Sequence, residues 1–344
     1  MKFEYKVYNL DLKYPFGISR EIKSSVNRVI TKISYDYKGI TYSGYGEAAP
    51  SSFYGESTDT VIAYYKWVED SKILEKTPYE LTDINLKLSS MAGNMSAKAG
   101  IDVALYDLLA KMHDIPLYKY LGLNKKSSKT SYTIDIANIE SILRKTGDAL
   151  IEGYDILKVK LGTDMDDEII FSIRQAAPEV DIRVDANCAW DLKKALKMIK
   201  ILEKYDIELI EQPLAHDNYK DLQILRHSTN IPIIVDESCV TCEDVIKLYG
   251  MVDGINLKLS KNGGITNCIK MVNIARACKM SVMIGCFLET SLGISAASHM
   301  ASLVDYIDLD GCLLLKEDPF GLMKFVKSEI IVSENPGLTN ASLF

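Results

Sequence analysis

The stretch YDILKVKLG, residues 154–162, places Lys158 and Lys160 two residues apart in a run that otherwise consists mostly of Ile, Leu and Val. A short apolar run of this kind is typical of a buried strand. Side chains two residues apart on a strand lie on the same face, so the two lysines share one. Because burying an unpaired ammonium group costs several kcal/mol, this pair points to a function rather than to packing.

From about residue 129 the chain alternates short apolar strands with amphipathic helical segments such as 191–205 and 265–280. The expected strands are 131–136, 156–162, 181–187, 207–213, 232–238, 254–260, 281–286 and 305–311. Eight strands that alternate with helices favour a parallel (β/α) barrel over a doubly wound sheet. A Rossmann domain would also need a glycine-rich phosphate turn after its first strand, and NGGI at 262–265 is not one.

The first 125 residues have a different pattern. Alternating segments at 3–16 and 29–48, the second with a Lys-Gly turn, predict β-strands. Two helical patterns follow at 57–74 and 96–115. Strands followed by helices indicate an α+β unit. We therefore expect an α+β domain at 1–125, a barrel at 126–315 and a C-terminal segment at 316–344.

Composition excludes several classes of protein. The chain has 344 residues, of which 47% are hydrophobic and 25% are charged, as in globular proteins. Its net charge of −7 argues against nucleic-acid binding, and it has no apolar run long enough to cross a membrane. The seven scattered cysteines suit reduced thiols and a cytoplasmic location. The CxxC pair Cys239 and Cys242 is weak evidence for a metal or redox site. We expect a homo-oligomer of unspecified subunit number.

Charged residues recur at one phase of the strand–helix repeat. After Lys160 come Asp185, Glu211, Asp236 and Lys258, at successive spacings of 25, 26, 25 and 22 residues. In a barrel, that phase is the rim at the carboxyl ends of the strands, where active sites form. Each residue by itself has about even odds of being a solvated or capping charge, as we expect for Glu208 at the start of its strand. Together they predict one site.

The three carboxylates of Asp185, Glu211 and Asp236 would repel one another unless a cation is shared among them. Ligands that are all oxygen suit Mg²⁺, whereas zinc prefers His and Cys. The four histidines, at 113, 216, 227 and 299, lie outside this phase of the repeat. The sequence therefore predicts one Mg²⁺ ion per subunit.

A metal at this site suggests a chemical role for the pair Lys158 and Lys160. Residues two apart on a strand are about 6.6 Å apart, so two ammonium groups repel by roughly 2.5 kcal/mol. We expect this repulsion to make one lysine neutral and able to act as a base near pH 7. The site would accept a carboxylate substrate, remove its α-proton and stabilise the resulting enediolate on the metal.

The motifs KVK (158–160), DAN (185–187), EQP (211–213), DES (236–238) and INLKLSKNGG (255–264) together resemble the muconate-lactonizing branch of the enolase superfamily. The resemblance covers nearly the whole chain. It implies a modified (β/α)₇β barrel whose N-terminal α+β domain caps the site, with the C-terminal segment returning to that domain. It also implies that Asp185, Glu211 and Asp236 hold Mg²⁺ and that Lys160 and Lys258 are acid/bases on opposite faces of the α-carbon. Lys158 would neutralise the substrate carboxylate.

Within that branch, DLD at 308–310 resembles the motif of dipeptide epimerases that holds the N-terminal amine of the substrate. ETSLGI (289–294) and Thr133 in SYTI also resemble this subgroup. The resemblance implies an isomerase, a dipeptide epimerase acting on L-Ala-L-Glu and L-Ala-D-Glu in cell-wall peptide turnover. Alternatively, Asp308 and Asp310 pin a neighbouring loop.

Other activities of the same fold stay open. They are o-succinylbenzoate synthase, a muconate-type cycloisomerase, an N-acylamino acid racemase and a non-catalytic carboxylate-binding barrel. Substrate specificity depends on YPFGISREIKSS (14–25), which the resemblance makes a loop over the substrate side chain. Arg20 or Lys23 pointing inward would favour an acidic dipeptide, whereas Glu21 pointing inward would favour a cationic or neutral one. A solvated charged loop is as plausible for any one of these residues, and the pattern assigns no role to Glu237.

Overall fold

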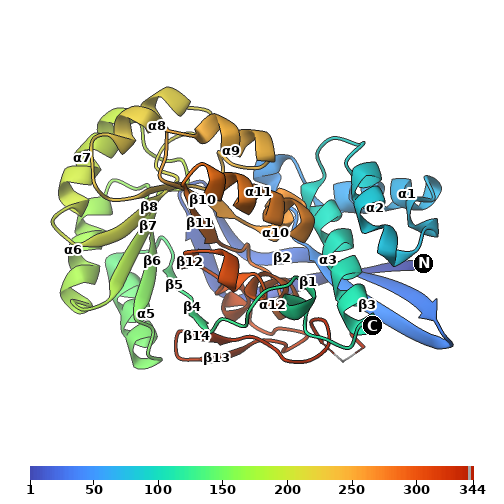
Figure 1. The fold of residues 1–344 in the computed structure, drawn as a ribbon. Coiled ribbons are helices and arrows are strands. Elements are labelled where there is room, and N and C mark those ends of the chain that lie inside the picture. The colour runs from blue at the N-terminus through green and yellow to red at the C-terminus, as the bar shows by residue number, and fades with distance from the viewer. Residues whose placement is uncertain (340–341) are drawn as a thin grey trace.

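The computed structural model describes residues 1–339 and 342–344, which form two lobes (Figure 1). The smaller lobe contains the antiparallel sheet β1 (Lys2–Ile18), β2 (Glu21–Tyr37) and β3 (Ile40–Ala48). The predicted turn between the last two strands is present at Lys38 and Gly39, whose φ angles of 51° and 80° are left-handed. Its helices are α1 (Thr58–Asp70), α2 (Leu81–Leu88), α3 (Met95–Met112) and α4 (Leu117–Tyr120). The pattern analysis missed α2.

Helix α3 packs directly on the sheet because two glycines of β3 allow it. A Cβ atom on Gly44 would lie 2.0 Å from the carbonyl oxygen of Ala104, and one on Gly46 would lie 2.1 Å from that of Gly100. Any side chain at these positions would force the helix away from the sheet. Most of α3 is buried as a result, including Ile101, Leu105 and Leu108.

The larger lobe contains a parallel sheet of all eight predicted strands in chain order, which confirms the barrel class. Its strands are β5 (Tyr132–Ile134), β6 (Ile156–Lys160), β7 (Asp181–Asp185), β8 (Ile207–Glu211), β9 (Ile233–Val235), β10 (Gly254–Leu257), β11 (Ser281–Ile284) and β12 (Tyr306–Ile307). The helices are α5 (Ile139–Ile151), α6 (Asp166–Ala176), α7 (Leu192–Leu202), α8 (Tyr219–Arg226), α9 (Cys242–Leu248), α10 (Leu259–Asn262), α11 (Ile265–Ala277) and α12 (Ser291–Ser298).

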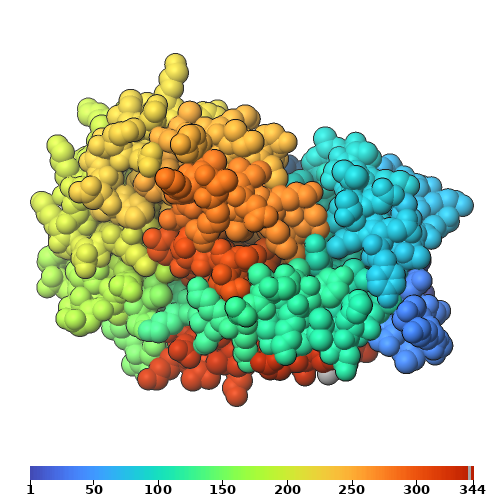
Figure 2. All heavy atoms as spheres, viewed as in Figure 1, coloured from blue at the N-terminus to red at the C-terminus, as the bar shows by residue number. Residues whose placement is uncertain are grey.

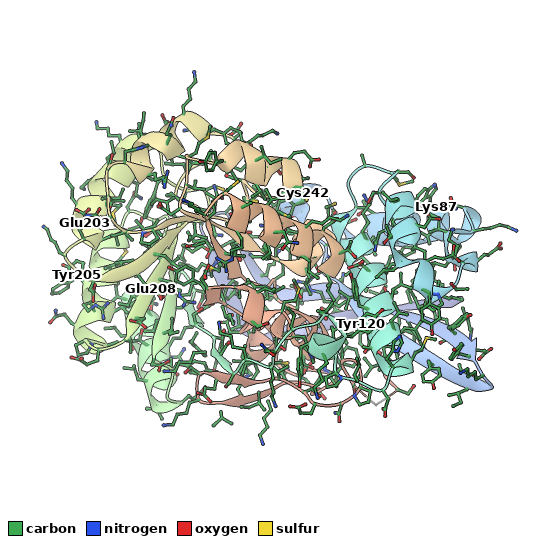
Figure 3. The ribbon with its side chains drawn as sticks, in the orientation of Figure 1. Lys87, Tyr120, Glu203, Tyr205, Glu208 and Cys242 are labelled. Carbon is green, nitrogen blue, oxygen red and sulfur yellow. The ribbon has the colours of Figure 1, made fainter. Side chains whose placement is uncertain are left out.

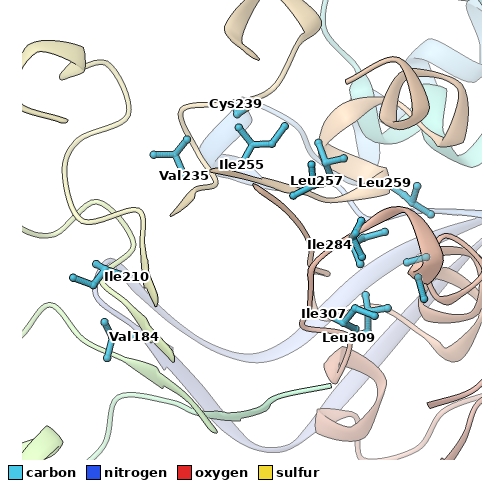
Figure 4. Close-up of a cluster of buried hydrophobic side chains, with 14 of the residues drawn as sticks. Val184, Ile210, Val235, Cys239, Ile255, Leu257, Leu259, Ile284, Ile307 and Leu309 are labelled. Carbon is cyan, nitrogen blue, oxygen red and sulfur yellow. The ribbon is translucent and has the colours of Figure 1, made fainter. Parts of the chain in front are cut away.

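Strand alternation separates the packing face of the barrel from its chemical face. Val184, Ile210, Val235 and Leu257 lie around the ring of strands in the buried cluster of Figure 4. Each is followed at once by a charged residue. Asp185 and Glu211 end β7 and β8, and Asp236 and Lys258 directly follow β9 and β10. Because successive strand side chains point to opposite faces, the apolar residues pack toward the helices and the polar ones point inward.

The seam between β5 and β12 is closed by side chains. In the described part of the chain, no backbone ladder joins these two strands. Instead the Leu309 N–H donates to Thr130 Oγ1 at 2.7 Å, and the Thr133 N–H donates to Asp310 Oδ2 at 2.7 Å. Ser131 Oγ donates to Asp308 Oδ1 at 2.5 Å. The predicted DLD motif is therefore part of the seam.

The C-terminal segment crosses from the barrel back to the smaller lobe. Strands β13 (Lys324–Val326) and β14 (Glu329–Ile331) form a small sheet with β4 (Ser128–Lys129). Farther on, the Leu117 N–H donates to the Gly337 carbonyl, and Lys32 Nζ donates to the Phe344 carbonyl. In Figure 2 this segment lies beneath the green stretch that follows α3. None of the helices in the described ranges is long and apolar enough to cross a membrane.

Candidate active site

Charged side chains gather at the carboxyl ends of five neighbouring strands. The parallel ladders pair Lys160 of β6 with Asp185 of β7, and Asp185 with Glu211 of β8. Asp236 directly follows β9, and Lys258 directly follows β10. With Lys158 they form what we call the strand-end cluster, and every member is buried. The structure therefore brings together the residues that share one phase in the sequence.

Ion pairs connect the first half of this cluster. Lys160 Nζ lies 2.7 Å from Asp185 Oδ2. Lys158 Nζ lies 2.7 Å from Glu211 Oε2, 2.7 Å from Asp308 Oδ2 and 3.2 Å from Asp185 Oδ2. Lys158 is thus enclosed by three carboxylates, which answers how a buried strand accommodates two lysines.

Lys261 completes the second half of the cluster. Asp236 Oδ2 lies 2.8 Å from Lys258 Nζ, and Asp236 Oδ1 lies 2.7 Å from Lys261 Nζ. Lys261 also donates to the carbonyls of Asp236 and Asn256, and the Asn256 amide donates to Glu211 Oε1. The sequence analysis gave no role to Lys261 or Asn256. The available signal was their presence in the motif INLKLSKNGG, where Lys261 is a further buried lysine.

The carboxylates control the protonation of the lysines. Burial opposes charge on Lys158, but Asp308, Glu211 and Asp185 raise the pKa of Lys158 well above its usual value. Burial likewise opposes charge on Lys258, and Asp236 raises the pKa of Lys258. Lys158 is thus the charged member of the lysine pair, because the neighbouring negative charges outweigh the effect of burial. That the other member of the pair is neutral stays a prediction.

The three carboxylates differ in their electrostatic environment. Although burial opposes ionisation, Lys160 and Lys158 lower the pKa of Asp185 to about 2. Lys258 and Lys261 lower the pKa of Asp236 against the same effect of burial. Burial and the charge of Asp185 raise the pKa of Glu211 to about 7. Glu211 is the carboxylate whose charge the lysines compensate least.

The donor set suits an oxygen-liganded cation. Glu211 Oε2 is buried and accepts no hydrogen bond of good geometry, although Lys158 Nζ is close to it. Within residues 1–339 and 342–344, no three His, Cys, Asp or Glu side chains already surround one point at metal-binding distances. The lysine ammonium groups lie among the carboxylates instead. Three buried carboxylates on adjacent strand ends fit Mg²⁺ as a ligand set. The ion would supply the positive charge that compensates the Glu211 carboxylate.

Asp308 and Asp310 face the same cavity, but their pKa values are shifted in opposite directions. Against the effect of burial, Lys158 lowers the pKa of Asp308. Burial and the charge of Asp308 raise the pKa of Asp310 to about 6. Both residues line the cavity with Thr133, whose backbone N–H contacts Asp310. The two aspartates pin the barrel seam and are also in position to contact a ligand.

The segment 14–25 is a hairpin tip, and the expectation of a loop is wrong. β1 and β2 stay paired up to Ile18 and Glu21, so that Ser19 and Arg20 alone make the turn. A register shift between Asp11 and Phe16 accompanies this extension. We call residues 16–23 the hairpin tip. The Gly17 N–H donates to Asp135 after β5, which holds the tip over the mouth of the barrel.

Arg20 reaches from the hairpin tip into a buried acidic site. Its Nη2 donates to Glu237 Oε1 at 2.7 Å, and its Nη1 donates to the Asn187 carbonyl at 3.0 Å. Glu21 pairs with Lys23 at 2.8 Å on the same hairpin. Arg20, Glu21 and Lys23 all line the cavity between the hairpin tip and the strand-end cluster.

Comparisons with known proteins decide the family. Residues 4–122 match the N-terminal domain of the mandelate racemase/muconate lactonizing enzyme family, and residues 142–339 match the enolase C-terminal domain-like family. The chain belongs to this enolase-superfamily branch. The resemblance stated from the motifs is confirmed over most of the chain.

Several similar proteins in this family are dipeptide epimerases by name. The chain is 37% identical over 341 residues to an L-Ala-D/L-Glu epimerase of Bacteroides thetaiotaomicron, covering 98% of this chain and 87% of that protein. A substrate-liganded L-Ala-D/L-Glu epimerase structure from Bacillus subtilis has a TM-score of 0.92 and 34% identity, covering 98% and 97% of the two chains. A dipeptide epimerase from Cytophaga hutchinsonii, complexed with Mg and D-Ala-L-Val, has a TM-score of 0.90 and 34% identity, with 98% and 94% covered.

Glu237 is the functional candidate of this family member that motif reasoning left without a role. It is buried next to Asp236, and it accepts hydrogen bonds from Arg20 and, at 3.3 Å, from the Asn187 amide. Its second oxygen, Oε2, is buried without a hydrogen-bond partner. Burial and the charge of Asp236 raise the pKa of Glu237. Its partner Arg20 comes from the other lobe, and no local sequence pattern predicts a contact between the lobes.

Proposed function

We propose that the protein epimerises dipeptides by removing and returning the α-proton of the C-terminal residue, with one Mg²⁺ ion per subunit. The observation that carries this proposal is the placement of Lys160 and Lys258 on the wall of one cavity. They end or follow β6 and β10, four strands apart in a ring of eight, and so lie on opposite sides of the barrel. Two lysines that flank a point are what inversion at carbon requires.

Each lysine has a separate task in this proposal. Lys160 takes the α-proton from the L residue, and Lys258 takes it from the D residue. Lys160 and Lys258 now contact Asp185 and Asp236 at 2.7 and 2.8 Å, and a cation held by these two aspartates would free both amines to face the cavity. Lys158 neutralises the substrate carboxylate. Phe287 lies 4.7 Å from Lys258 Nζ and covers that lysine from one side, which limits access of water.

Asp185, Glu211 and Asp236 would hold the Mg²⁺ ion. A cation there stabilises the negative charge that develops on the substrate carboxylate as the α-proton leaves. The cation would also replace the ion pairs that now neutralise these carboxylates. The Mg-complexed relative from Cytophaga hutchinsonii supports this choice of metal.

The N-terminal amine of the dipeptide would bind at Asp308 and Asp310. Two buried carboxylates beside a cavity attract an ammonium group, and Asp310 has no cationic contact among the ion pairs of the described residues. The Lys158–Asp308 contact favours a second candidate, racemisation of N-acylamino acids, in which no ammonium group needs a partner. A cytoplasmic location, a role in cell-wall peptide turnover and a homo-oligomer stay predictions.

The test is α-proton exchange. The protein is incubated with a library of L-Ala-X dipeptides in D₂O, with and without Mg²⁺, and the products are read by mass and by chiral separation. We expect deuterium only in the C-terminal residue, together with inverted product, and only with Mg²⁺. Exchange of N-acetylated amino acids at an equal rate would favour the racemase. No exchange from any substrate would overturn the proposal.

A further inference from the structure

The side chain of the epimerised residue has a defined place in the cavity if the proposed function holds. The α-carbon lies between Lys160 and Lys258, its carboxylate meets the strand-end cluster, and the N-terminal amine lies at the seam between β5 and β12. The opposite side of the ring carries the loops after β7 and β9, with Asn187 and Glu237. The hairpin tip covers that side through Arg20. The side chain therefore points toward Arg20.

The charges on this side of the cavity are already paired. Arg20 is bound by Glu237, whose side chain is only 1% exposed, so the pair is shielded from water at its acidic end. Glu21 and Lys23 neutralise each other on the rim. The hairpin tip therefore offers neither a free cation nor a free anion to a substrate.

An acidic substrate side chain could bind here only by exchanging the Arg20–Glu237 ion pair for a new one, which is unfavourable. To bind it, Arg20 would have to leave Glu237, which would keep only the Asn187 amide as a partner. A buried carboxylate that loses its cation is strongly destabilised. A cationic side chain would lie against Arg20 and Lys23. An uncharged side chain needs no such exchange.

The surfaces around Arg20 suit a ring. The guanidinium lies 4.4 Å from the centroid of Phe53, which is not part of the cavity wall, whereas Arg20 is. Phe53 therefore covers one face of the guanidinium, which leaves the other face for a substrate ring. Guanidinium planes stack on aromatic rings. Phe16, Tyr54 and Phe287 also line this cavity and add apolar surface.

We propose that the enzyme prefers dipeptides whose C-terminal residue is large and uncharged, an aromatic residue above all, and that the Arg20–Glu237 pair sets this preference. The pair acts as a neutral, planar platform against which the substrate ring stacks. Glu237 keeps Arg20 from serving as a receptor for a carboxylate.

Matched substrates test the preference directly. Values of kcat/KM are measured for L-Ala-L-Gln and L-Ala-L-Glu, which differ in charge but hardly in shape, and for L-Ala-L-Phe and L-Ala-L-Leu. We expect Gln to exceed Glu by about tenfold or more and Phe to exceed Leu. Glu equal to or better than Gln would overturn the inference and leave epimerase activity intact. Failure of every dipeptide to exchange would instead overturn the proposed function.

Variants locate the cause. Glu237→Gln releases Arg20, so the Gln-to-Glu ratio should fall by about tenfold or more, whatever happens to overall activity. Glu208→Gln is the control: Glu208, at the start of β8, pairs with Arg183 at 2.6 Å at the opposite end of the barrel (Figure 3). It should leave the ratio unchanged. An unchanged ratio in Glu237→Gln would overturn the role of the pair.

A second variant covers the case in which Glu237→Gln does not fold. Arg20→Met keeps the unbranched stem of the side chain but removes the guanidinium plane. We expect the Phe-to-Leu ratio in kcat/KM to fall by about threefold or more, since stacking on a guanidinium contributes of the order of 0.5–1 kcal/mol or above. A Phe-to-Leu ratio that does not change would overturn the stacking part of the inference.

Discussion

The strand-end cluster and the hairpin tip face each other across one cavity but are built in different ways. The cluster comes from consecutive strands of one sheet, and its members are buried and linked by contacts of 2.7–3.2 Å. The tip consists of two short paired strand ends and a two-residue turn from the other lobe, and the Arg20 side chain is 33% exposed. In our proposal, the reaction therefore depends on side chains of one sheet, whereas the choice of substrate depends on a separate element from the other lobe.

Metal removal should give the largest effect, because it acts on the cluster as a whole. Chelation should reduce epimerisation of a good dipeptide to background, and added Mg²⁺ should restore it. Glu211→Gln removes one negative ligand and should lower kcat by roughly 10²–10³-fold. Circular dichroism would check that the variant is folded. Full turnover by protein shown to be free of metal would contradict the assignment of Asp185, Glu211 and Asp236.

Loss of one lysine should come next in size and should split the reaction in two. Lys160→Ala should abolish exchange of the L-configured substrate and spare that of the D-configured substrate, and Lys258→Ala should do the reverse. Each affected exchange should fall by roughly 10²–10⁴-fold. Proton NMR in D₂O measures both. If one variant lost both exchanges while the other still epimerised, a single base would be at work.

The strand-end cluster was predictable because barrel geometry turns a sequence interval into a position. Spacings near 25 residues repeat one strand–helix unit, so Asp185, Glu211 and Asp236 fall on one rim without any knowledge of tertiary contacts. The protonation of Lys158 was not predictable in this way. It depends on Asp308, which lies 150 residues away in the chain and contacts Lys158 only across the seam between β5 and β12.

The hairpin tip resisted prediction for a related reason. Its strands pair through a register shift after Asp11, and the sequence there mixes apolar and polar residues with a proline and a glycine. The partner of Arg20 is Glu237, 217 positions away on the other lobe. Contacts between the lobes produce no periodicity in the local sequence. The spacing of charged residues therefore predicts the reaction but not the substrate specificity.

N-acetylated substrates test whether Asp308 and Asp310 bind the substrate or only close the seam between β5 and β12. N-acetylation of a good dipeptide should lower kcat/KM by about tenfold or more if the amine is held there, since a desolvated charge pair contributes a few kcal/mol. The ratio of free to acetylated dipeptide should also depend on pH. Because the pKa of Asp310 is raised to about 6, its charge is present above pH 6 and lost below it. The ratio should therefore fall as the pH drops through 6.

An acetylated dipeptide that turns over as well as the free one at every pH would mean that the aspartates only close the seam. The rates for both substrates also change as the lysines change protonation with pH. The ratio of kcat/KM for the free and the acetylated dipeptide cancels this shared dependence.

The smallest effect should come from loosening the hairpin tip without changing its charges. Ser19 Oγ lies 3.3 Å from the Asn187 carbonyl and 3.4 Å from that of Ala186, and it ties the tip to the loop after β7. Ser19→Ala removes these bonds, which contribute about 0.5–1.5 kcal/mol, so KM should rise by less than about tenfold. Ser90→Ala is the matched control, because it removes a hydroxyl-to-carbonyl bond after α2 in the smaller lobe and should leave KM unchanged.

The rate of α-proton exchange at saturating substrate separates the two regions most clearly. The bases and the proposed metal ligands belong to the barrel, so a looser hairpin tip should leave the exchange rate of the bound dipeptide within about twofold. A fall in that rate with an unchanged KM would place the tip in the proton-transfer step. Chemistry and specificity would then not be divided between the strand-end cluster and the tip, because closure of the tip would be needed to arrange the lysines around the α-carbon.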